Sequence, residues 1–216
     1  LRTGPTLPRR HVLALLASAA PARLWAQPRF PERALTLVVP FAPGGIADIT
    51  ARAVAEQLAR GLGQPVVVDN KPSAGSIVAS QAVAGARPDG HTLLLMSNGH
   101  AVSTGLFRKL PYDPVRDFAP VSTLGFFDLG FCVDAGSPYR QLQDVLAAAR
   151  AKPGALNLGT IAVGSTQHLA AKLFETVAGI DVTLVPYKGT PAVLTALRSG
   201  EIDLAVEILG PLLPQV

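Results

Sequence analysis

The chain has 216 residues, of which 49% are hydrophobic and only 16% are charged, so it can bury a core and is not a disordered polypeptide. Its formal charge of +4 comes from one end, because four of the 19 lysines and arginines, and no acidic residue, lie within residues 1–26. Residues 27–216 therefore carry 15 basic and 15 acidic side chains, a balance that argues against nucleic acid as a partner.

The first 26 residues have the pattern of an export signal. Arg9 and Arg10 precede the apolar stretch His11–Ala20, which has the length of a signal-peptide core and is too short to span a bilayer. Cleavage motifs end at Ala22 and Ala26. We predict that residues 1–26 direct export to the periplasm by the Sec route, with the twin-arginine route and a short N-terminal helix as the alternatives.

From residue 34 onward, apolar strand-like runs alternate with helical ones. Residues 34–39 predict a buried strand, followed by the turn Pro40–Asp48 and an amphipathic helix over 49–58. Further strands are predicted at 64–69, 92–96, 121–125, 129–134, 156–159, 182–186 and 202–206, and further helices at 77–86, 141–152, 165–178 and 191–199. This alternation predicts an α/β fold of parallel sheets that helices cover on both faces.

A proline-rich segment interrupts the alternation at Leu110–Pro120. Its three prolines cannot lie inside a sheet, so the segment is interpreted as a crossing between two α/β lobes, residues 27–120 and 121–216. The lone cysteine, Cys132, cannot form an internal disulfide and is expected to be a small buried hydrophobic residue.

The turn Pro40–Asp48 is the first candidate binding element. The opening N–H groups of the helix that follows have no partner inside the helix, and the helix dipole makes that end mildly positive. Such a turn suits an anion, in particular a carboxylate. Asp48 has two interpretations: an ordinary acid in the first helical turn, or a group that orients the glycine turn or accepts a hydrogen bond from a ligand or a water.

Small and polar residues also follow other predicted strands, at 70–76, 97–99, 159–168 and 186–189. Any one of these segments is explained by good turn chemistry alone. Together they favour a binding site, because ligands of open parallel sheets bind outside the carboxyl ends of the strands.

Nucleotide-binding and catalytic patterns are weak. The turn at Pro43–Gly45 lacks both the Gly-Lys-Ser/Thr of a P-loop and the spacing of a dinucleotide fold. Ser165, His168 and Asp203 invite a serine-hydrolase triad, but no Gly-x-Ser-x-Gly elbow surrounds the serine. The histidines have no metal-ligand spacing, so we expect no metal, no cofactor and no enzymatic activity.

Several short segments together resemble one protein family. They are Val38–Asp48, Gly63–Asn70, Pro88–Leu93, Leu110–Pro114 with Asp117–Pro120, Gln167–Leu169 and Val185–Gly189. Their residues and their order, from about 34 to 209, resemble the Bug family, the extracytoplasmic receptors of tripartite tricarboxylate transporters.

The resemblance implies a two-lobed periplasmic-binding-protein (Venus-flytrap) fold, here incomplete at the C-terminus because family members are longer. It implies a monomer that captures a small organic acid (a dicarboxylate, tricarboxylate, amino acid or aromatic acid) and delivers it to membrane permease subunits. A receptor that reports to a membrane sensor kinase is the alternative from a different class.

The resemblance also carries ligand contacts onto both lobes. They are Phe41, Ala42, Pro43, Gly44, Gly45, Asp48, Ser73, Ala74 and Ser97 in the first lobe, and Gly159, Thr160, Ser165 and Asp203 in the second. The chain departs from the family at Ser73–Ser76, where Gly-Ala-Gly-Gly is usual, and at Thr160–Ala162, where Ser-Ser-Gly is usual.

Overall fold

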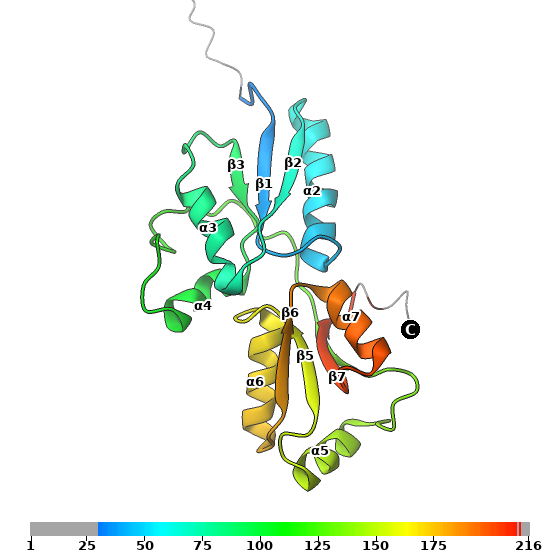
Figure 1. Cartoon of the computed structure of the whole chain (residues 1–216). Coiled ribbons are helices and arrows are strands. Elements are labelled where there is room, and N and C mark those ends of the chain that lie inside the picture. Colours follow the sequence, from blue (N-terminus) through cyan, green and yellow to red (C-terminus); the bar gives the residue numbers. More distant parts are fainter. Residues whose placement is uncertain (1–29, 211, 213–216) are drawn as a thin grey trace, which may run out of the picture. The chain divides into compact units, whose positions relative to one another are not determined.

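The structure is a computed structural model that describes residues 30–210 and 212, so the predicted signal peptide lies outside the described residues. The described strands form two sheets that share no strand (Figure 1). Strands of the first sheet end at Leu94 and those of the second begin at Leu129. The predicted lobe boundary at residue 120 falls between them and stays a prediction. Within the described part of the chain, no helix is both long and apolar enough to cross a membrane.

The first sheet has three parallel strands in the order β2-β1-β3, as the alternating pattern predicts. Figure 1 shows α2 beside β2 and α3 beside β3. The elements are β1 (Leu35–Val39), α2 (Ile46–Leu62), β2 (Val66–Asn70), the 3₁₀ turn η1 (Ala74–Ser76), α3 (Ile77–Ala84), β3 (Thr92–Leu94) and α4 (Asn98–Leu106). Leu37 and Val39 on the central strand are buried with Ala51 of α2, which fixes this helix on one face of the sheet.

The second sheet has the order β4-β7-β5-β6. Its elements are β4 (Leu129–Cys132), α5 (Leu142–Ala151), β5 (Asn157–Ile161), α6 (Thr166–Ala178), β6 (Thr183–Tyr187), α7 (Thr190–Ser199) and β7 (Leu204–Ile208). β5 pairs in parallel with β6 and β7, but β4 is antiparallel to β7. The prediction of purely parallel sheets is therefore wrong for this sheet, because β4 joins it as an edge strand directly from the proline-rich crossing.

Helices cover both faces of the second sheet, as predicted. Leu158, Leu204 and Val206 are buried on one face with residues of α5 and α6. Ala205 and Ile161 alternate with them and are buried on the other face with Val193 of α7. Cys132 is half-buried against this second cluster. Burial, and to a lesser extent the nearby charge of Glu207, raises the pKa of its thiol.

The structure differs from the prediction at a missing strand, an added helix and a shifted strand. Residues 121–125 form no strand, and Val121 is 86% exposed, because no described strand pairs with this segment. Helix α4 was not predicted, since Gly99, Gly105 and the polar residues between them are poor helix formers. The last strand begins at Leu204 and ends at Ile208, two residues later than predicted, so Asp203 precedes the strand and Glu207 is part of it.

Candidate functional site

Loops at the carboxyl ends of strands from both sheets approach one another. They line one narrow space with Phe41, Ser73, Gly75, Ser76, Gly99, Ala162, Val163, Gly164 and Ser165. The Gly75 N–H donates to the Val163 carbonyl at 3.1 Å, and the Thr166 hydroxyl donates to Asn98 Oδ1 at 2.6 Å. About 160 Å³ lies between the lining atoms, but no gap there fits a water-sized sphere. A ligand in this space requires the loops to move apart.

The first part of the site is the glycine turn that begins α2. Gly45 is the N-cap, and no side chain accepts from the opening N–H groups of the helix. Asp48 Oδ2 accepts from the Gly44 N–H and from Arg52 Nε, each at 3.0 Å, and its Oδ1 lies 2.9 Å from Arg52 Nη2. Of the two interpretations of Asp48, the contacts favour orientation of the glycine turn, because Oδ2 accepts from that turn and Arg52 lies against both oxygens.

Charge and burial act in opposite directions on Asp48. Burial of its side chain raises the pKa of the carboxyl, but hydrogen bonds from Arg52 and Gly44 lower that pKa by more, so it lies below the ordinary value. The group is therefore a carboxylate at neutral pH. Its negative charge is neutralised by Arg52, so it does not repel an anion at the turn as a bare acid would.

The second part is the loop between β5 and α6. Ser165 is the N-cap of α6: its Oγ accepts from the His168 N–H at 3.1 Å and donates to the Ile161 carbonyl at 3.2 Å. Gly164 has φ of +83°, and a Cβ there would lie 2.6 Å from Leu106 Cδ1. Glycine is needed at this position by both its backbone angle and the close approach.

The third part is the start of α7, to which sequence analysis assigned no contact residue. A Cβ on Gly44 would lie 3.3 Å from Pro191 Cγ, and one on Gly45 would lie 3.6 Å from Thr190 Oγ1. A Cβ on Gly189, the N-cap of α7, would lie 3.2 Å from Ala42 Cβ. The glycine turn therefore lies directly against a second helix N-terminus, and a side chain at Gly44 or Gly189 would be tightly packed there. In the sequence, the strand-end segment 186–189 was the feature that pointed to this helix start.

A fully buried acid, Glu207 on β7, lies beneath these helix starts. Its Oε2 accepts from Gln167 Nε2 and from Thr190 Oγ1, each at 3.2 Å, so it joins the first turns of α6 and α7. Its Oε1 has no hydrogen-bond partner among the described residues. Burial raises the pKa of this carboxyl, against the hydrogen bonds from Gln167, Ile208 and Thr190, which lower it.

The predicted contact residues separate into groups. Phe41, Ser73 and Ser165 line the narrow space, and Ala42, Gly44 and Gly45 face α7. The others close by are Pro43 in the same turn, Asp48 behind it, Ala74 in η1, and Ser97, whose Oγ lies 3.5 Å from Ser76 Oγ. Other lining residues were not predicted as contacts, although all of them lie in or next to the strand-end segments singled out in the sequence. They are Gly75, Ser76, Gly99, Ala162, Val163 and Gly164.

Three of the predicted contact residues do not line the site. Gly159 is inside β5, where a Cβ would lie 2.2 Å from Ile202 Cδ1, so it is a packing residue. Thr160 is fully buried under His168. Asp203 precedes β7 and accepts from the Asn157 N–H at 2.8 Å, at the opposite end of the sheet. Asp203 lies at the amino end of this strand, and Glu207 lies near its carboxyl end, so Glu207, not Asp203, is the acid at the site end.

The arrangement does not support a serine hydrolase. The Ser165 hydroxyl caps a helix, and His168 Nδ1 lies 3.4 Å from Thr160 Oγ1. Burial, together with the charge of Lys172, lowers the pKa of His168, so the imidazole is neutral at pH 7. Asp203 is at the far end of the sheet. Nor do the described residues contain any cluster of three or more histidine, cysteine or acidic side chains suited to a metal ion.

The chain is similar to known proteins of one family. The model of the family TctC, described as the tripartite tricarboxylate transporter family receptor, matches residues 50–216. The chain belongs to this family. Relatives include a UPF0065 protein of Bordetella pertussis, 39% identical over 202 residues, and protein BugT of the same species, 32% identical over 203. These matches cover 92% and 93% of this chain, but only 61% and 62% of the relatives.

Solved structures of the same type resemble the fold. An R. palustris protein with adipate has a TM-score of 0.81 at 35% identity, and the match covers 86% of this chain and 64% of that protein. MatC from Rhodopseudomonas palustris with bound malate has a TM-score of 0.78 at 34% identity, with 86% and 63% covered. The fold is that of a two-lobed periplasmic binding protein, of which the chain spans less than two thirds, and the Bug resemblance is confirmed.

Proposed function

We propose that this TctC-family chain acts as a periplasmic solute-binding protein that captures a small organic carboxylate between its strand-end loops. The observation that carries the proposal is the convergence of the starts of α2, α6 and α7, with the Ala42–Gly45 turn facing Thr190 and Pro191. Helix N-termini offer N–H donors and a partial positive charge, which suit a carboxylate without a cluster of arginines.

The proposed ligand class is a dicarboxylate or a similar small acid. The two solved relatives described above hold adipate and malate, and both molecules have two carboxylates separated by a short carbon chain. In this proposal one carboxylate meets the glycine turn and the start of α7, and the other meets the loop Ala162–Ser165. The ligand separates the loops, and its contacts with both sheets then stabilise the bound arrangement.

Calorimetric titration of the full chain tests the proposal. The panel is adipate, malate, citrate, glutamate and benzoate, with adipamide as the neutral match to adipate. We expect at least one carboxylate to bind and to raise the melting temperature, and adipamide to do neither, because only the charged group gains from the helix N-termini. A folded sample that binds no member of the panel contradicts the proposal.

A pair of glycine variants locates the site. Gly164→Asp introduces a carboxylate between the loops, and we expect it to weaken ligand binding at least tenfold by charge repulsion and bulk. Gly200→Asp is the matched control: Gly200 also has a positive φ, +74°, but a Cβ there has open space around it at the end of α7. Equal loss of binding in both variants would mean that backbone strain, not the site, is responsible.

Delivery to the membrane is the second half of the proposal. We propose that the bound form docks on the permease subunits of a tripartite tricarboxylate-type transporter, and that residues 1–26 direct export to the periplasm. Expression in a Gram-negative host, followed by mass measurement of the periplasmic fraction, tests export. A mature N-terminus after Ala22 or Ala26 is expected, and retention of an uncleaved chain in the cytoplasm contradicts it.

A further inference from the structure

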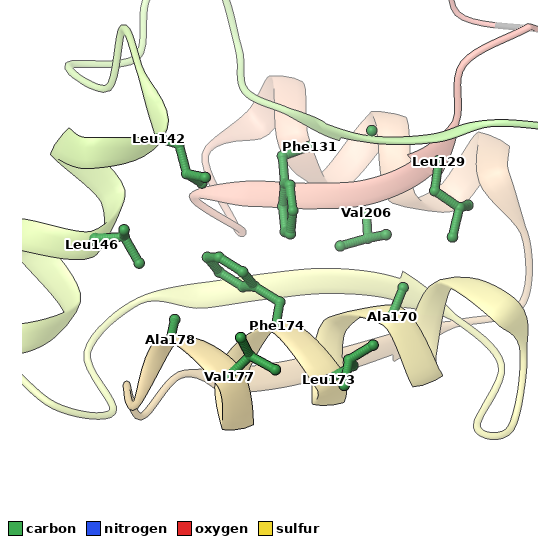
Figure 2. Close-up of a pocket in the computed structure, with 11 residues that line it drawn as sticks. Leu129, Phe131, Leu142, Leu146, Ala170, Leu173, Phe174, Val177, Ala178 and Val206 are labelled. Carbon is green, nitrogen blue, oxygen red and sulfur yellow. The ribbon is translucent and has the colours of Figure 1, made fainter.

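Glu207 lies on the face of the second sheet that α7 covers. Val206, the residue before it, lines an open apolar groove of about 470 Å³ on the opposite face, between β4, α5 and α6 (Figure 2). Successive side chains of a strand point to opposite faces, so Glu207 points away from this groove, to the side where Thr190 at the start of α7 contacts it. The side chain is fully buried there, so the few groups that touch it determine its charge.

The hydrogen-bond partners of Glu207 are all neutral. Its Oε2 accepts from Gln167 Nε2, from Thr190 Oγ1 and from the Ile208 N–H, at 3.2, 3.2 and 3.3 Å. Its Oε1 has no hydrogen-bond partner in the part of the chain that the structure describes. A buried acid in such surroundings favours its protonated form, because no cation offsets the loss of hydration of the carboxylate.

The titratable groups around Glu207 do not change charge together with it. Burial, and then the charge of Glu207, raises the pKa of the Cys132 thiol on β4. Burial lowers the pKa of His168 on α6, and Asp48 behind the glycine turn has a lowered pKa and is already ionised where Glu207 titrates. β5 has no titratable side chain. The charged residues of α6 and α7 lie farther along the two helices, at Lys172, Glu175 and Arg198.

Thr190 joins Glu207 to the candidate site. Its Oγ1 lies 3.2 Å from Glu207 Oε2, and a Cβ on Gly45 would lie 3.6 Å from the same Oγ1. A hydroxyl has one proton to donate. When Glu207 is ionised, Oε2 accepts that proton, and Thr190 presents only lone pairs to an anion at the glycine turn. When Glu207 is protonated, the acid donates to Thr190 Oγ1, and the Thr190 proton is free to point at the anion.

We propose that carboxylate binding at the glycine turn is coupled to protonation of Glu207, through reversal of the Thr190–Glu207 hydrogen bond. The inference rests on the proposed function, because it concerns the same site. The negative charge of the ligand and its hydrogen bond from Thr190 both favour the protonated acid, so binding takes up a proton from the solvent onto Glu207. Affinity therefore falls as the pH rises above the pKa of Glu207 in the free protein, by at most about tenfold per pH unit for one proton.

Calorimetric titration of the full chain in phosphate and in Tris at the same pH measures this uptake, because the two buffers release protons with different enthalpies. The probe is adipate, or malate where adipate does not bind. We expect the wild-type binding enthalpy to differ between the buffers. In Glu207→Gln the amide donates to Thr190 as the protonated acid does. This variant should lose the difference, bind with an affinity that is flat from pH 6 to pH 8, and bind more tightly than the wild type at pH 8.

Variants of Thr190 test the hydrogen bond itself. Thr190→Ser keeps the hydroxyl and should keep the proton uptake, whereas Thr190→Val should lose the uptake and weaken binding. Glu56→Gln, at an exposed acid on α2, is the control and should behave as the wild type. Protonation of the ligand itself is the same for every variant, so differences between variants belong to the protein. Circular dichroism checks that each variant folds, and the two Thr190 variants decide the question if Glu207→Gln does not.

The outcomes separate this inference from the proposed function. If no acid of the panel binds, the proposed function fails and the inference fails with it. If an acid binds but Glu207→Gln shows the same buffer and pH dependence as the wild type, only the inference is overturned. Equal proton uptake by Thr190→Ser and Thr190→Val also overturns it, because the hydroxyl then does not connect the ligand to Glu207.

Discussion

At the scale of single residues, Glu207 is the group that the fold perturbs in the most unusual way. An acid that is fully buried, with one oxygen lacking a hydrogen bond, costs stability when it is ionised. Because burial raises its pKa in the folded chain, the folded state holds this proton at pH values where the unfolded chain has lost it. Its contribution to stability therefore falls as pH rises from the unfolded pKa through the folded one.

Glu207→Gln removes this dependence. We expect the variant to gain stability relative to the wild type as the pH rises from 4.5 to 8. The difference in unfolding free energy should grow by about 1.4 kcal/mol for each unit of the wild-type pKa shift, and the difference in melting temperature should grow with it. Other carboxylates, such as Asp48, affect both proteins equally and cancel. Thermal melts across this range provide the measurement, with Glu56→Gln at an exposed site as control. A difference that is flat with pH contradicts the prediction.

Ser76 is strained in a way that the family resemblance explains. Its φ is +62°, and it is the only described residue other than glycine with a positive φ. The left-handed conformation costs an L-residue about 1–2 kcal/mol, and the family usually has glycine here. Glycine in turn loses about 0.5–1 kcal/mol to its freedom in the unfolded chain.

We therefore expect Ser76→Gly to stabilise the chain by up to about 1 kcal/mol, measured by urea unfolding. Ser122→Gly, in an exposed loop without a positive φ, should instead be neutral or destabilising. If both variants lose stability alike, the Ser76 backbone is not strained.

At the scale of elements, α6 depends on its N-cap. The Ser165 hydroxyl satisfies one opening N–H and one strand carbonyl, so Ser165→Ala should lower the unfolding free energy by about 1 kcal/mol. Thr195→Ala is the control, because Thr195 only donates to the Pro191 carbonyl within its own helix. Equal effects of the two variants on urea unfolding would remove the cap argument.

Local signals predicted most elements. The strand–turn–helix unit at β1 and α2 follows from neighbouring residues alone. Helices α6 and α7 each end at a glycine with a positive φ, Gly179 and Gly200, which is another local signal. The local signals failed for strands whose existence or bounds depend on pairing with another strand. Residues 121–125 have strand-like composition but no partner, and β7 begins two residues late because its register is set by β4 and β5.

At the scale of the whole molecule, the balanced charge of residues 27–216 is consistent with membership of a receptor family for small acids. The balance of 15 basic and 15 acidic residues over 27–216 suits a protein that binds a small acid through helix N-termini and not through a basic surface. The TctC match over residues 50–216 gives the family, and the match covers only about 61% of a relative's length.

The amino-acid sequence by itself determined the alternation of strands and helices, the glycine turn with Asp48 behind it, the Ser165 loop and the family, because each depends on neighbouring residues or on short motifs. Only the tertiary structure decided that α7 faces the glycine turn, that Glu207 and not Asp203 lies at the site, and that the α5–α6 face is open. These depend on the strand order β4-β7-β5-β6, which joins residues far apart in the sequence.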